Sequence, residues 1–548
     1  MTPQEVGLPK KFAEWREHQE ETIQFILNSK KKFIFLSQPT GAGKSPVYVA
    51  AALRVGLKTA ILTHTKALQD QLLGDFSTCR LADLRGQSSF ECAVDRRLTV
   101  DDGLCHFGYK CEVKHRCGYY VQFGPALSAP LVLSNYAFWM TSNDRTSRGK
   151  DEDDPLDKDT RAFNDHTRLL VMDEGHLAHS CLLNHLSTEL AIPDFHKYGF
   201  EVPRLKSNIA GWKAWAVGIL STARGQIESG SASVTAEDCK LDIGRYHQLN
   251  GLRKLVRLLE RVVEIDGEWK VAQDSKVVKF EPVKPGRERI NRTLFSHAEK
   301  VIITSATLRP TEAKKLALRE DEFDFLDVPH TFPAKRRPFI PINGPRISYK
   351  TTDGEMLRSW VPVIDAIIRN RLDRKGIIHT ISFKRRDLLI QNSEFSELMF
   401  TNPFQLPIQR VVEEFRQADP PAIFVSPSLA QGYDFPDDDC YYQIIGKVPF
   451  PSIGSDAMKA RMEDDQLLLH ELTMQTLVQM AGRGVRSKDD FCETFIVDAV
   501  FSDWFKKHKK LAPLWFIEAV RASKDSIPKP IPLNGLAIKT PALSGTKI

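Results

Sequence analysis

The sequence predicts an α/β protein with two lobes, each built as a doubly wound parallel sheet. Short apolar runs that are typical of buried parallel strands recur in two separate sets along the chain. Each run ends near glycine or polar residues, and segments with helical patterning lie between the runs, which is the alternation of a doubly wound domain. At 548 residues, the chain is long enough to bury more than one core.

The first lobe contains apolar runs at residues 33–36, 60–63, 169–172 and 301–303. The second lobe contains runs at 376–379, 422–425, 443–445 and 494–497. Two insertions interrupt the first lobe. We therefore predict a first lobe in three parts (1–76, 129–179 and 296–330), a cysteine-bearing insertion (77–128), a mainly helical insertion (180–295), a second lobe (331–523) and an extended C-terminal tail (524–548).

Two further segments carry local signals. The end of the helical insertion, with Trp269, Val271 and Phe280, has a pattern typical of strands. The stretch from Asn143 to Asp159 is polar and dense in acidic residues, so we expect a solvated loop there.

Composition limits the class of protein. Hydrophobic residues make up 42% of the chain and charged residues 27%, as in ordinary globular proteins. The net charge of +6 is compatible with a nucleic-acid partner without indicating one. We find no signal peptide and no run approaching about 18 apolar residues, so we expect no membrane span and a cytoplasmic location. In a reducing compartment, the nine cysteines favour a metal site over disulfides.

A glycine-rich segment at residues 38–45 follows the first run and predicts a phosphate-binding loop. Glycines let backbone N–H groups converge on phosphate oxygens at the start of a helix, where the helix dipole also favours anions. Lys44 would reach the β- and γ-phosphates of ATP, and Ser45 would ligate Mg²⁺. Pro46 has no N–H, so one backbone contact to phosphate is expected to be missing. The predicted ATP-binding residues of this loop are Thr40, Gly41, Gly43, Lys44 and Ser45.

Two acidic residues, Asp173 and Glu174, follow the run at 169–172. Asp173 would hold hydrated Mg²⁺, and Glu174 would orient and deprotonate the attacking water. An acidic pair at a strand end is commonly a solvated turn, but the phosphate loop upstream favours the catalytic interpretation. His176 is either an ordinary surface histidine or a residue that couples hydrolysis to movement, and its place after the acidic pair favours coupling.

Arg483 and Arg486 lie three residues apart, on one face if their segment is helical. Guanidinium groups from one lobe can stabilise the charge that develops on a γ-phosphate held by the other lobe. The alternative is a solvated basic helix. The nearby Gln479 and Gly482 favour the catalytic interpretation, in which hydrolysis depends on closure between the lobes.

Four cysteines, Cys92, Cys105, Cys111 and Cys117, lie close together in the first insertion. Four thiolates at this spacing can surround one metal centre, so a zinc site, a [4Fe–4S] cluster and a loop without metal all remain open. The absence of a Cys-x-x-Cys pair weakens the zinc interpretation. Cys79 lies outside the group and indicates an ordinary packed thiol.

In this order, the segments resemble those of the XPD/DinG family of superfamily 2 iron–sulfur helicases, over residues 12–498. Arg16 and Gln19 resemble the family's adenine-sensing element. Segments that resemble other family motifs lie at 63–72 (DNA contact), 85–92 and 117–120 (the two ends of the iron–sulfur segment), 304–308 (the link from hydrolysis to DNA movement), 430–436 and 447–451.

The resemblance implies two RecA-like lobes, with ATP, Mg²⁺ and a [4Fe–4S] cluster held by the four cysteines as cofactors. The insertion at 180–295 would be the family's arch domain. Gly175 replaces the alanine of the family's DEAH-type box, which is a departure that removes no catalytic group. Outside the phosphate loop, the residues that the resemblance assigns to nucleotide contact are Gln19, Gly432, Asp434 and Gln479.

We therefore expect a monomeric ATP-dependent DNA helicase that translocates 5′ to 3′ on single-stranded DNA and unwinds duplex or R-loop structures. The resemblance implies that the strand crosses both lobes and passes between the iron–sulfur and arch domains. One alternative is a single-stranded DNA translocase that unwinds weakly, and another is a non-catalytic DNA-binding subunit. The presence of Lys44, Glu174 and Arg486 disfavours the second alternative.

Overall fold

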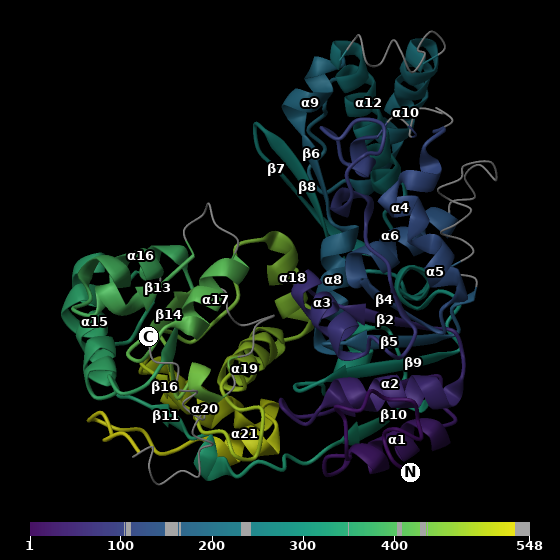
Figure 1. Cartoon of the computed structure of the whole chain (residues 1–548). Helices are drawn as coiled ribbons and strands as arrows, with labels where there is room; N and C mark the ends of the chain where they lie inside the picture. The colour runs from purple at the N-terminus through teal and green to yellow at the C-terminus, as the bar shows by residue number, and fades with distance from the viewer. Residues whose placement is uncertain are drawn as a thin grey trace, which may run out of the picture.

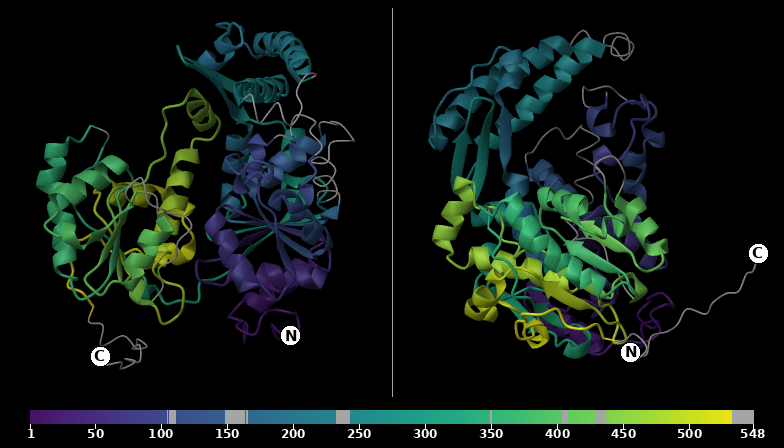
Figure 2. Two further views of the ribbon diagram at one scale, coloured as in Figure 1. Left: turned by 45° about the horizontal axis from the view of Figure 1, so that its top comes forward. Right: turned by 90° about the vertical axis from the view of Figure 1, so that its left-hand side faces the viewer.

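The computed structural model describes residues 1–103, 105, 111–147, 163, 166–231, 243–348, 350–402, 408–427, 435 and 437–531. Two α/β lobes lie side by side, and a domain of helices and a small sheet stands above the first lobe (Figure 1). The left-hand view of Figure 2 again shows the two lobes apart. The predicted two-lobed α/β fold is confirmed. None of the helices in this part of the chain is both long and apolar enough to cross a membrane.

The first lobe is built on a seven-stranded sheet whose neighbouring strands are all parallel. The four predicted runs form its central strands, which are almost entirely buried. The apolar pattern missed the edge strands because their residues are mostly only half-buried. In spatial order the strands are β10 (Phe323–Asp327), β1 (Phe33–Ser37), β9 (Lys300–Ser305), β5 (Leu169–Asp173), β2 (Thr59–Thr63), β4 (Leu131–Asn135) and β3 (Leu81–Asp83).

Parallel pairing brings the carboxyl ends of these strands to one edge of the sheet. The phosphate loop follows β1, the acidic pair lies at the end of β5, and residues 304–308 lie at and beyond the end of β9. The sheet therefore gathers three segments that are far apart in the sequence. Helices of this lobe and of the cysteine-bearing insertion are α1 (Gln19–Asn28), α2 (Lys44–Val55), α3 (Lys66–Asp75), α4 (Gly118–Val121), α5 (Phe123–Ser128), α6 (Tyr136–Ser147), α8 (Ala178–Leu186), α13 (Arg287–Ile290) and α14 (Glu312–Lys315).

The second lobe has a six-stranded sheet that is also parallel throughout. The predicted runs again form its centre, whereas β11 and β13 are too short to have been recognised. In spatial order the strands are β11 (Phe339–Pro341), β16 (Glu493–Ile496), β15 (Tyr442–Ile445), β12 (Gly376–His379), β14 (Ile423–Ser426) and β13 (Met399–Phe400). The helices are α15 (Asp353–Arg369), α16 (Phe383–Asn392), α17 (Ile408–Gln417), α18 (Asp456–Asp464), α19 (Leu468–Ala481), α20 (Val500–His508) and α21 (Leu514–Ala519).

The helical insertion combines two long helices with a three-stranded antiparallel sheet in the order β6-β8-β7. Strands β7 and β8 correspond to the predicted strand-like end. The buried Trp212 packs its ring 5.3 Å from that of Phe280, and the apolar core continues into the first lobe. The elements are β6 (Thr188–Ala191), α9 (Ile192–Lys197), α10 (Ile209–Ser231), α12 (Ile243–Val263), β7 (Glu268–Gln273) and β8 (Val277–Lys284).

The expectation of a solvated loop from Asn143 is wrong at its start, because residues 143–147 belong to α6. Asp144 is buried and lies 2.9 Å from His185 Nε2 and 3.2 Å from Arg289 Nη2. Burial alone would raise the pKa of Asp144, but these partners lower it. The sequence pattern gave no sign of this network because its members come from distant segments. Residues 148–159 lie outside the described residues.

A stability prediction follows from the buried ion pair in the second lobe, where Arg371 Nε lies 2.9 Å from Glu493 Oε2 and the side chains are 0% and 3% exposed. Glu493→Gln leaves the Arg371 charge uncompensated, so we expect the free energy of unfolding to fall by about 3 kcal/mol. The control is Glu394→Gln, whose partner Arg369 is 56% exposed. Glu394→Gln should lower the free energy of unfolding by less than about 1 kcal/mol. Chemical denaturation followed by circular dichroism measures both, and equal losses would contradict the prediction.

Candidate nucleotide site between the lobes

The phosphate loop connects β1 to α2, and two glycines with left-handed backbone conformations shape it. The φ angles of Gly41 and Gly43 are 80° and 75°. A Cβ atom on Gly41 would lie 2.5 Å from Phe332 Cε2, and one on Gly43 would lie 2.4 Å from Gln19 Nε2. The loop therefore requires glycine at both positions. Because α2 begins at Lys44, its unpaired N-terminal N–H groups adjoin the loop.

Arg16 and Gln19 hold the carbonyl groups of this loop. Gln19 donates from Nε2 to the oxygens of Ala42 at 3.1 Å and Gly43 at 2.9 Å. Arg16 donates from Nη1 to the Gly41 oxygen and also, at 3.2 Å, to the oxygen of Arg486 in the second lobe. Arg16 therefore links the phosphate loop to the arginine segment across the gap between the lobes.

The acidic pair lies directly opposite Lys44. Glu174 has a left-handed φ of 50°, and its Oε1 lies 3.3 Å from Lys44 Nζ. Asp173 is buried and accepts a hydrogen bond from Tyr48 Oη at 3.2 Å. Burial and then the Glu174 charge raise the pKa of Asp173, whereas Lys44, working against burial, lowers that of Glu174. Sequence reasoning missed Tyr48, although its place one helical turn after Lys44 puts both on one face of α2.

His176 is buried and joins three segments. Its Nδ1 lies 2.7 Å from Ser305 Oγ at the end of β9, and its Nε2 lies 2.6 Å from Gln479 Nε2 on α19. An amide nitrogen only donates, so His176 Nε2 accepts and the Nδ1–H group donates to Ser305. Burial lowers the pKa of His176 to about 4, in keeping with a neutral ring. The interpretation of His176 as an ordinary surface histidine is therefore wrong.

Arg483 and Arg486 lie in an irregular segment after α19. The helix ends before Gly482, so the condition under which both would share one face of a helix is not met. A Cβ atom on Gly482 would lie 2.6 Å from Thr40 Oγ1, which shows how closely this segment approaches the phosphate loop. Burial lowers the pKa of both arginines, and the Glu174 carboxylate opposes that shift in each. Both guanidinium groups therefore lie within electrostatic range of Glu174.

These segments enclose a cleft of about 990 Å³ between the lobes. Ligand sites commonly have volumes of about 300–1,000 Å³, so the cleft has room for a nucleotide. Thr40 lies beside the cleft against Gly482, and the predicted residues Gly432 and Asp434 lie outside the described residues. The predicted residues that line the cleft are Gln19, Gly41, Gly43, Lys44, Ser45, Asp173, Glu174, Gln479, Arg483 and Arg486.

The four cysteines of the first insertion lie near one another. Cys92 and Cys117 are buried, and Cys105 and Cys111 are partly exposed. A Cβ atom on Gly103 would lie 3.5 Å from Cys105 Sγ and 3.6 Å from Cys92 Sγ. Burial, followed by the neighbouring thiols, raises the pKa of Cys105 to about 11. Over the described ranges, no three Cys, His, Asp or Glu side chains stand as a formed metal site, although the four thiols are a suitable donor set.

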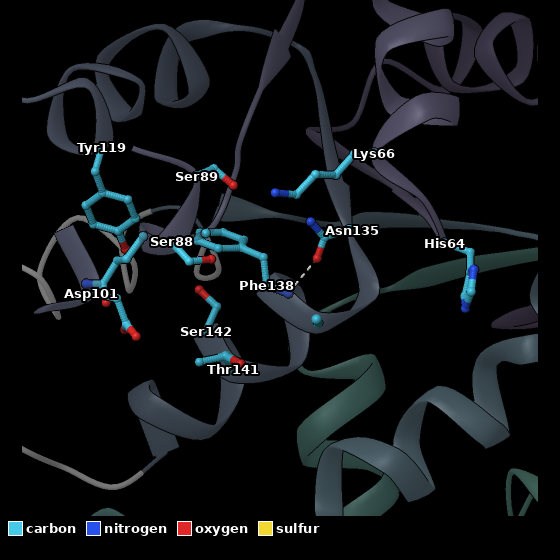
Figure 3. Close-up of a pocket in the computed structure, with 13 residues that line it drawn as sticks. His64, Lys66, Ser88, Ser89, Asp101, Tyr119, Asn135, Phe138, Thr141 and Ser142 are labelled. Carbon is cyan, nitrogen blue, oxygen red and sulfur yellow. Dashed lines mark hydrogen bonds between the residues drawn. The ribbon is translucent and has the colours of Figure 1, made fainter. Parts of the chain in front are cut away.

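A second cavity of about 420 Å³ lies between the first lobe and the cysteine-bearing insertion (Figure 3). In Figure 3 the Lys66 side chain points toward Ser89 and Asn135. Phe138 adds an aromatic wall, and its N–H donates to Asn135 Oδ1 at 2.9 Å. His64 lines both this cavity and the nucleotide cleft, so the two spaces adjoin.

Comparisons with known proteins agree with this geometry. Residues 12–190 match the family model described as "Type III restriction enzyme, res subunit", and residues 378–518 match "Helicase C-terminal domain". A comparison with curated proteins found no match. The fold is similar to the solved structure "XPD_Helicase", with a TM-score of 0.60, 16% identity, and coverage of 91% of this chain and 98% of that one. It is also similar to Xpd4 of S. tokodaii, with a TM-score of 0.57, 13% identity, and coverage of 92% and 100%.

The fold and the cleft define a two-lobed, ATP-driven helicase core, with one family match on each lobe. Within that class, the fold of the chain is similar to that of the two XPD structures over nearly its whole length.

The glycine geometry generates a prediction with a matched control. Gly56, at the end of α2, also has a left-handed φ of 71°, but a Cβ atom there would meet nothing within 4 Å. Gly43→Ala and Gly56→Ala therefore impose a similar strain of about 1–2 kcal/mol, and only Gly43→Ala displaces Gln19. We expect Gly43→Ala to weaken ATP affinity by about tenfold or more and Gly56→Ala to change it by less than about twofold. Titration with a fluorescent ATP analogue measures both, and equal affinities would refute the site.

Proposed function

We propose that this protein is an ATP-dependent DNA helicase that translocates 5′ to 3′ along single-stranded DNA and unwinds duplex or R-loop structures. The observation that carries the proposal is a single cleft lined by Lys44 and Glu174 from one lobe and by Arg483 from the other. A site divided in this way is completed or opened by movement of the lobes, so nucleotide turnover and lobe movement are coupled.

In the proposed reaction, Lys44 leaves Glu174 and binds the β- and γ-phosphates of ATP, beside the N-terminal N–H groups of α2. Glu174 then orients and deprotonates the water that attacks the γ-phosphate. Ser45 and Asp173 would hold Mg²⁺, whose charge offsets that of the phosphates. Tyr48 keeps the Asp173 carboxylate oriented through the hydrogen bond to its Oδ2.

Arg483 and Arg486 would stabilise the charge that develops on the γ-phosphate, because they approach it from the second lobe. His176 would couple a change in the site to both lobes, because it is hydrogen-bonded to Ser305 of the first lobe and to Gln479 of the second. Loss of the γ-phosphate would change the charge that Glu174 and Arg483 experience and so favour a different lobe arrangement.

The cavity of Figure 3 supports a nucleic-acid path across the first lobe. The exposed Lys66 suits a phosphate, and Asn135 and Ser89 offer hydrogen bonds beside an aromatic wall. Single-stranded DNA would continue between the cysteine-bearing and helical insertions. The 5′ to 3′ direction and the preference for DNA rest on the resemblance to XPD and DinG.

Cys92, Cys105, Cys111 and Cys117 would hold a [4Fe–4S] cluster. In its described residues, the insertion that contains them has short helices and one three-residue strand, so this part has little secondary structure of its own. A cluster would supply covalent cross-links that fix such a segment in one shape. The fixed segment would then act as a wedge against duplex DNA.

The proposal is tested by measuring ATP hydrolysis alone, with single-stranded DNA and with single-stranded RNA, and by unwinding of duplexes with a 5′ or a 3′ tail. DNA-stimulated hydrolysis together with unwinding from a 5′ tail is the expected result. Stimulated hydrolysis without unwinding would favour a translocase. Absence of hydrolysis under all conditions would indicate a non-catalytic DNA-binding subunit.

Lys44→Ala should lower ATP turnover by about two orders of magnitude or more, roughly 3 kcal/mol, because it removes the cation that faces the phosphates. Glu174→Gln should bind ATP yet hydrolyse it slowly. Both side chains face the cleft, so thermal unfolding should change little. DNA-stimulated hydrolysis at the original rate in either variant would contradict these roles.

Replacing any one of the four cysteines by serine should remove the broad absorbance near about 400 nm that thiolate-bound iron produces, together with bound iron and sulfide. Unwinding should fall far more than DNA-independent hydrolysis, because the nucleotide cleft is built from other segments. Cys79→Ser is the control, since Cys79 is buried and its sulfur donates to the Gly7 oxygen instead. Protein prepared without oxygen that carries zinc and no iron would refute the cluster.

A further inference from the structure

One face of α19 carries three polar side chains at four-residue spacing: Glu471, Gln475 and Gln479. Residues at this spacing lie along one side of a helix. Their exposed fractions are only 5%, 8% and 6%, and each of them contacts a residue of the first lobe. Buried polar groups are costly without partners, so this face of α19 depends on the contact between the lobes.

Glu471 is the charged member of this row and lies at the centre of an interlobe cluster. Its Oε1 is 2.7 Å from Arg309 Nη1, and its Oε2 is 2.8 Å from Lys315 Nζ. Lys315 Nζ also lies 3.0 Å from Glu312 Oε1, which accepts a hydrogen bond from Gln475 at 3.0 Å. Two carboxylates and two cations thus balance one another. Removal of one of them leaves a buried charge without compensation.

The cluster is joined to the nucleotide site along two routes. In the first lobe, Arg309 comes four residues after Ser305, whose hydroxyl lies 2.7 Å from His176. In the second lobe, Gln479 lies two residues short of the end of α19, about 12 Å along the helix from Glu471. Its amide lies 2.6 Å from the other nitrogen of His176. The two segments that the cluster clamps together therefore both contact His176.

We propose that Glu471 is a positioning residue of the ATPase cycle, which fixes α19 against the first lobe so that Arg483 faces Glu174. This inference rests on the proposed ATPase function. It adds that the contacts of Glu471, remote from the cleft, set the position of Arg483. Glu471 touches neither the nucleotide cleft nor the acidic pair. Its effect on turnover passes through α19.

A double-mutant cycle separates this role from a merely structural one. The variants are Glu471→Gln, Arg483→Ala and the double variant, with kcat and KM for ATP measured for each. If Glu471 acts by positioning Arg483, it has nothing to position once that arginine is gone. The double variant should then lose no more kcat than Arg483→Ala alone. A structural role predicts that the two losses multiply.

We expect Glu471→Gln to lower kcat by about tenfold and to change KM and ATP affinity by less than about threefold, because the nucleotide is held mainly by the first lobe. The matched control is Glu413→Gln on α17, an exposed glutamate of the second lobe, whose kcat should stay at the original value. Thermal unfolding of every variant identifies those that fold.

A folded Glu471→Gln variant with unchanged kcat would overturn the inference, and so would losses that multiply in the cycle. If Glu471→Gln does not fold, Arg309→Gln replaces it, because the Arg309 side chain is 29% exposed and tolerates substitution better. It should show the same non-additivity with Arg483→Ala. Failure of the proposed function is distinguishable, since Lys44→Ala and Arg483→Ala would then leave ATP turnover unchanged.

Discussion

The pair of hydrogen bonds made by His176 is the constraint on which the catalytic arrangement depends. One ring nitrogen is occupied by Ser305 of the first lobe and the other by Gln479 of the second. Because burial favours the neutral ring, one ring nitrogen donates and the other accepts. A shift of α19 against the first lobe would therefore break a buried hydrogen bond between His176 and Gln479, which itself lines the cleft.

The parallel sheet of the first lobe explains why His176 and its two partners lie so close to the residues of the cleft. The strand ends that carry Lys44, Glu174 and Ser305 are neighbours in the first sheet, so their side chains need no long loops to meet. The second lobe contributes Arg483 from an irregular segment after α19. Its position is consequently set by how α19 lies on the first lobe. Interlobe contacts far from the phosphate loop therefore influence where Arg483 lies.

The sequence was informative where structure is local and uninformative where it depends on tertiary contact. Central strands such as β5 are buried on both faces and were predictable from their continuous apolar runs. The half-exposed strand β10 has no such run. Lys44 and Glu174 were predictable from short motifs. The buried network around Asp144 was not predictable, because its partners come from distant segments. The end of α19 before Arg483 was not predictable either, because tertiary packing decides it.

The helical insertion is connected directly to strands of the first sheet that carry residues of the cleft. The helical insertion starts beyond β5 and returns to β9, so both of its connections run to strands of the nucleotide site. It also touches the second lobe, where Arg461 of α18 donates from Nε to the Pro282 oxygen of β8 at 3.1 Å. Since α18 directly precedes α19, one short stretch of the second lobe contacts both the insertion and the cleft. A change in the lobe arrangement must therefore be accommodated both at the insertion and at the cleft.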